Sequence, residues 1–129
     1  RPLPPVPRRP VQVAVVPLPV RSDDFRLRHK TSDRSAYNEA RAASGAYEVL
    51  FEDDDGFLTE GSFTSLFIER GDRLVTPPLA RGILPGVLRS RLIEEGEAEE
   101  GDIVVADLAG RFYVGNAVRG LIPAVLAPR

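Results

Sequence analysis

The stretch FLTEGSFTSLFIERGDRLVT, residues 57–76, indicates the fold of this 129-residue chain. Residues 57–60 and 64–69 are short runs of the kind that form strands. The Arg-Gly-Asp triplet at 70–72 predicts a hairpin turn, because Gly and Asp tolerate left-handed backbone, and residues 73–76 then pair back as a strand. The stretch therefore predicts a hairpin of residues 64–69 and 73–76, preceded by a strand at 57–60 that returns along residues 48–52.

Further strands and two helices are predicted on either side of this stretch. One helix follows a cap at Asp33 and runs to about Ser44; the other has Pro85 in its first turn and ends near Gly96. The remaining predicted elements are strands at 11–16, 48–52, 103–105 and 111–114, a tight turn at 53–56 and an acidic loop at 97–102. Strands outnumber helices and hairpins outnumber βαβ units, which favours an α+β domain with a largely antiparallel, curved sheet.

Each predicted helix has an apolar face. In the first helix the face is formed by Ala36, Ala40 and Ala43, with Tyr37 beside them. In the second it is formed by Val87, Leu88, Leu92 and Ile93. These faces are expected to pack against the sheet.

Composition suggests one domain behind a linker. Seven of the 12 prolines lie in the first nineteen residues, so residues 1–10 are expected to be an extended linker and residues 11–129 a domain. The first residue is Arg1 and there is no Met, which suggests a piece of a longer chain.

Several classes of protein are disfavoured by composition. The net charge of −2 comes from mixed charges and argues against a nucleic-acid surface. No apolar run approaches a membrane span. With no Cys and a single His, His29, neither a disulfide nor a His-based or thiolate metal site is expected. A cytoplasmic protein without nucleic-acid or membrane partners is the resulting expectation.

The first candidate for chemistry is Lys30, which lies between a polar loop and a helix start. Arg28 and His29 add positive charge, which favours the neutral, nucleophilic amine. The alternative is a solvated surface lysine.

The second candidate is Glu60, which follows a predicted strand. Its carboxylate would suit a pyridine nitrogen, which a negative charge keeps protonated. The alternative is an exposed residue at a strand end.

Two candidate anion sites come later in the chain. Gly86, Val87 and Leu88 open a helix, whose free N–H groups and dipole attract phosphate, and Gly86 allows close approach. Asn116 and Ala117 lie in a turn that can bind a phosphate oxygen or a substrate carboxylate. The alternatives are a plain loop-to-helix junction and a plain turn. An amine, a carboxylate and two anion sites are together the parts that hold pyridoxal 5'-phosphate (PLP).

The order of these motifs resembles the class IV aminotransferases, the fold-type IV PLP enzymes. This family includes branched-chain and D-amino-acid aminotransferases and 4-amino-4-deoxychorismate lyases. The resemblance extends from about Arg28 to Ala124 and is carried by residues 58–62, 64–67, 76–78 and 83–86. It implies the large C-terminal domain of that fold, a curved, mostly antiparallel sheet or pseudo-barrel with flanking helices.

The resemblance also implies a role for each candidate residue. Lys30 matches the lysine that bonds covalently to the cofactor, and Glu60 the partner of the pyridine nitrogen. Val87 and Leu88 match the backbone donors to the phosphate, and Asn116 and Ala117 match positions near the phosphate and the substrate carboxylate. Roles for Arg34, Tyr37 and Arg119 are left open.

Within the family, residues 29–31 and 115–120 are most similar to the lyase branch, especially to lyase domains fused behind an aminodeoxychorismate synthase. The implied activity releases pyruvate to give 4-aminobenzoate in folate biosynthesis. Amino-group transfer to a 2-oxo acid and a non-catalytic role are the alternatives. The resemblance further implies a cytoplasmic homodimer and a smaller N-terminal domain, absent from this chain, that completes the site for a small-molecule substrate.

Overall fold

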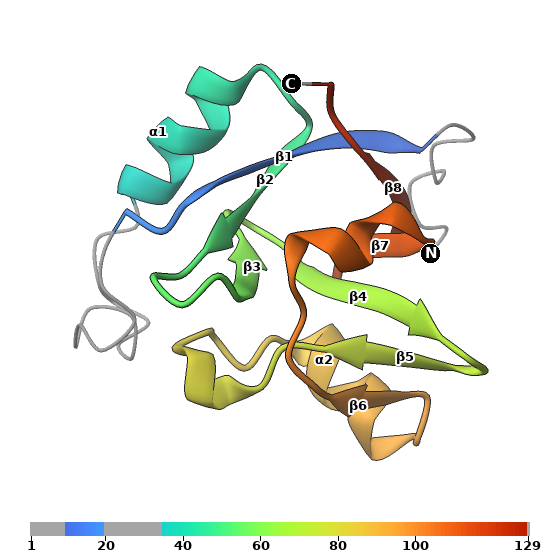
Figure 1. The fold of residues 1–129 in the computed structure, drawn as a ribbon. Helices are drawn as coiled ribbons and strands as arrows, with labels where there is room; N and C mark the ends of the chain where they lie inside the picture. The colour runs from blue at the N-terminus through green and yellow to red at the C-terminus, as the bar shows by residue number, and fades with distance from the viewer. Residues whose placement is uncertain (1–9, 20–34, 129) are drawn as a thin grey trace.

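The computed structural model describes residues 10–19 and 35–128, and within them it forms one curled, eight-stranded sheet with two α-helices (Figure 1). The strands lie side by side in the order β3-β2-β1-β8-β7-β4-β5-β6. Their bounds are β1 Val11–Pro17, β2 Glu48–Glu52, β3 Leu58–Gly61, β4 Ser65–Arg70, β5 Arg73–Thr76, β6 Ala98–Glu100, β7 Phe112–Asn116 and β8 Gly120–Leu126. The helices are α1, Ser35–Ser44, and α2, Val87–Glu94, with short 3-10 helices η2, Leu79–Arg81, and η3, Val105–Ala109.

The sheet is mixed, and its pairing follows from the connections. Strands β2–β3, β4–β5, β4–β7 and β7–β8 are antiparallel neighbours. Strand β1 is parallel to both β2 and β8, and β5 is parallel to β6. The connections β1–α1–β2 and β5–α2–β6 each carry the chain through a helix, which parallel neighbours require. The predicted α+β class with a curved sheet is confirmed.

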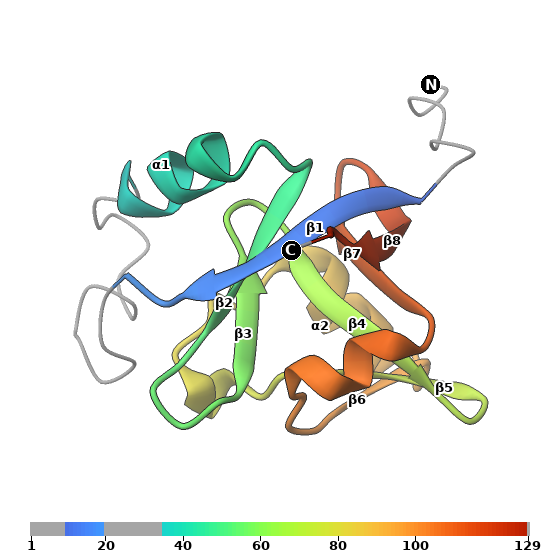
Figure 2. The ribbon, with the colours of Figure 1, turned by 45° about the horizontal axis from the view of Figure 1, so that its top comes forward.

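The sheet curls into a half-barrel with β3 and β6 at its two edges (Figure 2). The N–H of Leu58, at the start of the edge strand β3, donates to the carbonyl of Ile103 at 2.8 Å. Ile103 follows β6, the strand at the opposite edge. This bond joins the two ends of the sheet.

Strands β2 and β4 are buried on both faces. Leu50 of β2 and Leu66 of β4 belong to the core inside the curl, while their neighbours Phe51 and Phe67 point outward. This is the alternation of side chains along a strand. The helices pack against these outward side chains. Helix α1 covers β2 through Tyr37, and α2 covers β4 through Leu88 and Leu92.

Both helices differ in detail from the sequence prediction. Helix α2 begins at Val87 with Gly86 as its N-cap, so Pro85 precedes the helix instead of occupying its first turn. Val87 is 69% exposed and is not part of the buried face. In α1 the buried position is Tyr37, whose ring lies against that of Phe51 with the centroids 4.3 Å apart, whereas Ala43 is exposed. Asp33, the predicted cap, lies outside the described residues.

Three predictions near the C-terminus were wrong or incomplete. The acidic segment 97–102 contains β6, because an edge strand tolerates outward carboxylates while its backbone pairs with β5. Residues 103–105 do not form a strand; Ile103 is buried as a single residue and η3 follows it. Strand β8 was missed, because Pro123 within it interrupts the strand signal. No helix within 10–19 and 35–128 has the length and hydropathy to cross a membrane.

The packing of α2 on β4 makes a prediction about stability. Leu92→Ala leaves a cavity beneath the helix and is expected to lower the free energy of unfolding by about 2–5 kcal/mol. Val87→Ala, on the exposed side of the same helix, is expected to change it by less than about 0.5 kcal/mol. Urea denaturation of both variants measures the difference. Equal losses would contradict this orientation of α2.

Candidate functional site

A pocket of about 200 Å³ brings together parts of the chain that are far apart in sequence. It is lined by the end of β3, the loop from β3 to β4, the segment that leads into α2 and the turn from β7 to β8. The predicted site residues among its lining are Glu60, Gly86, Val87, Leu88, Asn116 and Ala117. Lys30, the remaining predicted site residue, lies outside the described residues, as do Arg28, His29 and Arg34.

Glu60 is buried at the end of β3. Only 6% of its surface is exposed, so the alternative of an exposed residue at a strand end was wrong. Its Oε1 accepts a hydrogen bond from the N–H of Leu84 at 3.3 Å, which ties the segment before α2 to β3. The pocket therefore has a buried carboxylate on its β3 side.

The start of α2 forms another side of the pocket. No side-chain hydrogen bond caps the helix at Gly86, and the first turn contains no acidic residue. The first-turn N–H groups and the helix dipole thus give this end partial positive charge. Gly86 and Ser65 both line the pocket, and a β-carbon at Gly86 would lie 3.4 Å from Oγ of Ser65, at ordinary contact distance. The geometry suits a bound anion.

Asn116 lies at the end of β7, and its side chain holds the turn. Its Oδ1 accepts hydrogen bonds from the N–H groups of Val118, at 3.1 Å, and Arg119, at 2.9 Å. Its Nδ2 donates to the carbonyl of Phe63 at 3.1 Å. An amide nitrogen has two N–H groups, so only the other one remains for a ligand, beside the backbone of the turn.

A glycine that the sequence prediction did not use brings the turn and α2 together. A β-carbon at Gly115 would lie 2.4 Å from the carbonyl oxygen of Gly120 and 3.0 Å from Cδ2 of Leu88. Strands β7 and β8 and helix α2 approach this closely only because the residue has no side chain. The sequence signal was the small-residue turn at 115–117.

Two arginines anchor the connection between β5 and α2. The Arg81 guanidinium lies 3.8 Å from the centre of the Phe57 ring and its Nε donates to Asp102 at 3.0 Å. This hydrogen bond lowers the pKa of Asp102 below its usual range. The buried Arg89 donates to the carbonyl of Pro77 at 3.1 Å and pairs with Glu100. These contacts fix the path of the segment that ends at the pocket.

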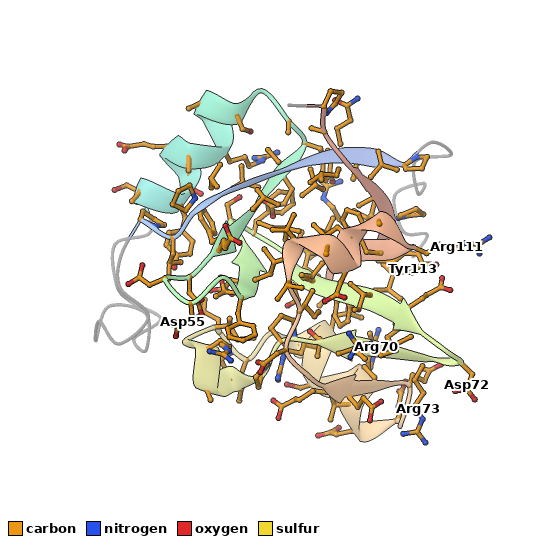
Figure 3. The ribbon with its side chains drawn as sticks, in the orientation of Figure 1. Asp55, Arg70, Asp72, Arg73, Arg111 and Tyr113 are labelled. Atoms are coloured by element: carbon orange, nitrogen blue, oxygen red, sulfur yellow. The ribbon has the colours of Figure 1, made fainter. Side chains whose placement is uncertain are left out.

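Two other hollows carry no comparable set of groups. One, of about 490 Å³, is lined by Pro10, residues 109–113 and residues 123–125, which are mostly apolar, with Arg111 as the charged residue. Another, of about 380 Å³, lies at the β4–β5 hairpin, where Figure 3 labels Asp72, Arg73 and Tyr113. There the Glu69 carboxylate accepts a hydrogen bond from the Tyr113 hydroxyl, and this bond raises the pKa of Tyr113. Within 10–19 and 35–128 no cluster of His, Asp or Glu has the arrangement of a metal site.

Comparison with known proteins identifies the family. The model of the class IV amino-transferases matches residues 1–126. Aminodeoxychorismate lyase of Saccharomyces cerevisiae is 35% identical over 107 residues, which are 75% of this chain and 28% of that protein. The chain therefore belongs to the class IV amino-transferase family, and the resemblance inferred from sequence is confirmed.

Solved structures share the fold. A putative amino-acid aminotransferase from Mesorhizobium loti superposes with a TM-score of 0.87 and 38% identity, over 98% of this chain and 65% of that one. The PLP-bound form of a hypothetical aminotransferase from Mycobacterium tuberculosis superposes with a TM-score of 0.81 and 22% identity, over 98% and 53%. The chain spans about a third of the length of the curated relatives it matches.

Proposed function

We propose that this chain binds PLP in the pocket between β3, α2 and the β7–β8 turn, as part of a PLP-dependent lyase. Class IV amino-transferases are PLP enzymes, so PLP is the cofactor expected of this site. The observation that carries the proposal is that a buried carboxylate, Glu60, and an uncapped helix start, at Gly86, line the same pocket. The first suits a cationic ring nitrogen and the second a phosphate.

Each residue then has a defined task. The N–H groups of Val87 and Leu88 bind the phosphate, and the turn at Asn116 and Ala117 binds a further phosphate oxygen or the substrate carboxylate. Glu60 keeps a proton on the pyridine nitrogen. Bound PLP supplies an electron sink for the carbon that bears the substrate amine.

Lys30 is proposed as the residue that bonds covalently to the cofactor. It is the only lysine in the sequence, so it is the only side-chain amine the chain offers. As a free amine, Lys30 would take a proton from the carbon that bears the substrate amine and, as the resulting ammonium, would return one later in the reaction. Arg28 and His29, its neighbours in sequence, favour the neutral amine that covalent attachment and proton abstraction both need.

The proposed reaction is that of a 4-amino-4-deoxychorismate lyase, which yields pyruvate and 4-aminobenzoate. Support comes from the 35% identity to the yeast aminodeoxychorismate lyase. The second candidate is amino-group transfer to a 2-oxo acid, favoured by the 38% identity to the Mesorhizobium aminotransferase.

Residues 11–129 are proposed to form the cofactor-binding domain, with another domain or subunit completing the site. The pocket of 200 Å³ is smaller than the roughly 300–1,000 Å³ of common small-molecule sites. A pocket of this volume is expected where one domain supplies only part of an active site. A homodimer and a place in folate synthesis remain predictions from the family.

Covalent attachment at Lys30 can be tested directly. After incubation with PLP and reduction with borohydride, mass spectrometry is expected to find the phosphopyridoxyl group on the peptide that contains Lys30. Lys30→Ala is expected to lose both the label and the visible absorbance of the bound cofactor. A label elsewhere in the wild-type protein would refute the assignment.

Glu60→Gln is expected to retain PLP but to lower kcat by about 10²-fold, the size of losing one preorganised electrostatic contact at a reacting centre. The physical reason is that an amide does not hold a proton on the ring nitrogen. Steady-state kinetics together with cofactor absorbance measure both effects. Glu99→Gln on the exposed face of β6 is the control and should leave both unchanged. Wild-type kcat in Glu60→Gln would reject this role.

The two candidate reactions differ in their products. With aminodeoxychorismate and no 2-oxo acid, a lyase is expected to release pyruvate and 4-aminobenzoate in equal amounts over many turnovers. A transaminase is expected to stop after one half-reaction until a 2-oxo acid is added. Chromatography of the products distinguishes the two, and neither product nor half-reaction would favour a non-catalytic role.

A further inference from the structure

Glu48, at the start of β2, is fully buried yet carries a carboxylate. Its Oε1 accepts hydrogen bonds from the N–H of Val49, at 2.8 Å, and from both the N–H and the hydroxyl of Ser62, at 2.9 and 2.6 Å. Its Oε2 accepts from the N–H of Phe63, at 3.1 Å, and the hydroxyl of Thr64, at 2.8 Å. The loop between β3 and β4 is thus folded around one side chain.

A carboxylate suits this set of donors, and an amide does not. Each oxygen of Glu48 receives at least one backbone N–H, and a backbone N–H cannot accept a hydrogen bond. An amide in the same place would turn an N–H group towards one of these backbone donors. Hydrogen bonds from N–H and O–H groups can stabilise a buried carboxylate in place of a cation. No salt bridge to Glu48 is found among the residues that the structure describes.

The backbone is shaped to this carboxylate. A β-carbon at Gly61 would lie 2.4 Å from Oε2 of Glu48 and 2.7 Å from Oγ1 of Thr64, so a side chain there would displace the Glu48 carboxylate from its hydrogen bonds. The N–H of Gly61 also donates to the carbonyl of Thr64 at 2.9 Å and closes the turn. Residues 61–65 all line the pocket, which makes this turn one of its walls.

The tip of the same loop is held from outside. The carbonyl of Phe63 accepts the bond from Asn116, and its ring lies 4.5 Å from the Arg41 guanidinium. The ring of Tyr47, the residue before β2, lies 5.8 Å from that of Phe63. The loop therefore joins β2, α1 and the β7–β8 turn to the pocket.

The bonds to Glu48 also give the pocket two electrically different ends. The N–H groups of Ser62 and Phe63 point at Glu48, so they are not available to an anion in the pocket. Glu60 places a carboxylate at the β3 side of the pocket, while the uncapped start of α2 lines another side. This arrangement favours a ligand with a cationic end at β3 and an anionic end at α2.

We propose that Glu48 is a positioning residue for the PLP site: its carboxylate folds the loop at 62–64 and so sets the wall against which the cofactor lies. This inference rests on the proposed function, since it takes the pocket to be the PLP site. Glu48 itself acts through the loop and does not contact the pocket, whose lining it does not join.

The test compares Glu48→Gln with Glu52→Gln, the same change at the other end of β2. Hydrogen exchange is measured first without PLP. The amides of Ser62 and Phe63 are expected to exchange about tenfold faster or more in Glu48→Gln, while those of β4 and β7 keep their wild-type rates. PLP titration followed by absorbance is then expected to show a dissociation constant raised about 10–100-fold, as for other residues that orient a ligand's direct partners. Glu52→Gln should change neither quantity.

Thr64→Val removes one donor to Oε2 of Glu48 without changing the shape of the side chain. It tests the positioning role of Glu48 if Glu48→Gln does not fold. This variant is expected to show faster exchange of the loop amides and a raised dissociation constant for PLP, both smaller than in Glu48→Gln. Wild-type exchange in the loop, or faster exchange without any loss of PLP affinity, would overturn the positioning role. A wild-type protein that binds no PLP would instead overturn the proposed function.

Discussion

The packing of strand β4 is the constraint on which the rest of this structure depends. β4 lies between β5 and β7, and both of its faces are buried: Leu66 faces the core inside the curl and Phe67 faces helix α2. Because successive side chains of a strand alternate, a shift of β4 by one residue would exchange these two environments. The position of α2, and with it the helix start at the pocket, follows from this register.

The site is built on that frame from two connections whose paths are fixed by polar side chains. The loop at 61–65 surrounds the buried Glu48 carboxylate, and the segment from β5 to α2 is held by the buried Arg89 and the partly exposed Arg81. Buried polar groups are costly unless they are hydrogen-bonded, so Glu48 and Arg89 admit few alternative paths for these segments. The pocket is thereby preorganised by residues that are not part of its lining.

Local patterns in the sequence predicted much of the fold. The alternation and turn residues of 57–76 predicted β3, β4 and β5 to within a residue at each end. Elements without such patterns were missed or misread, because their conformation comes from the neighbours they pair with. β6 is acidic and joins the sheet through backbone pairing with β5, and β8 contains Pro123. Val87 belongs to an apolar pattern but lies on the exposed side of α2, since packing on Phe67 sets the rotation of the helix.

For the site, the sequence by itself determined the chemical groups: one lysine, a carboxylate after a strand, a glycine at a helix start and a small-residue turn, in an order typical of one enzyme family. These features depend only on residue type and spacing along the chain. Only the tertiary structure decided that Glu60 is buried, that the Asn116 amide is engaged within its own turn, and that Glu48 supports the pocket. The reason is that burial and hydrogen-bond partners depend on residues distant in sequence: Glu48 meets Ser62, and Asn116 meets Phe63, only after the sheet has curled.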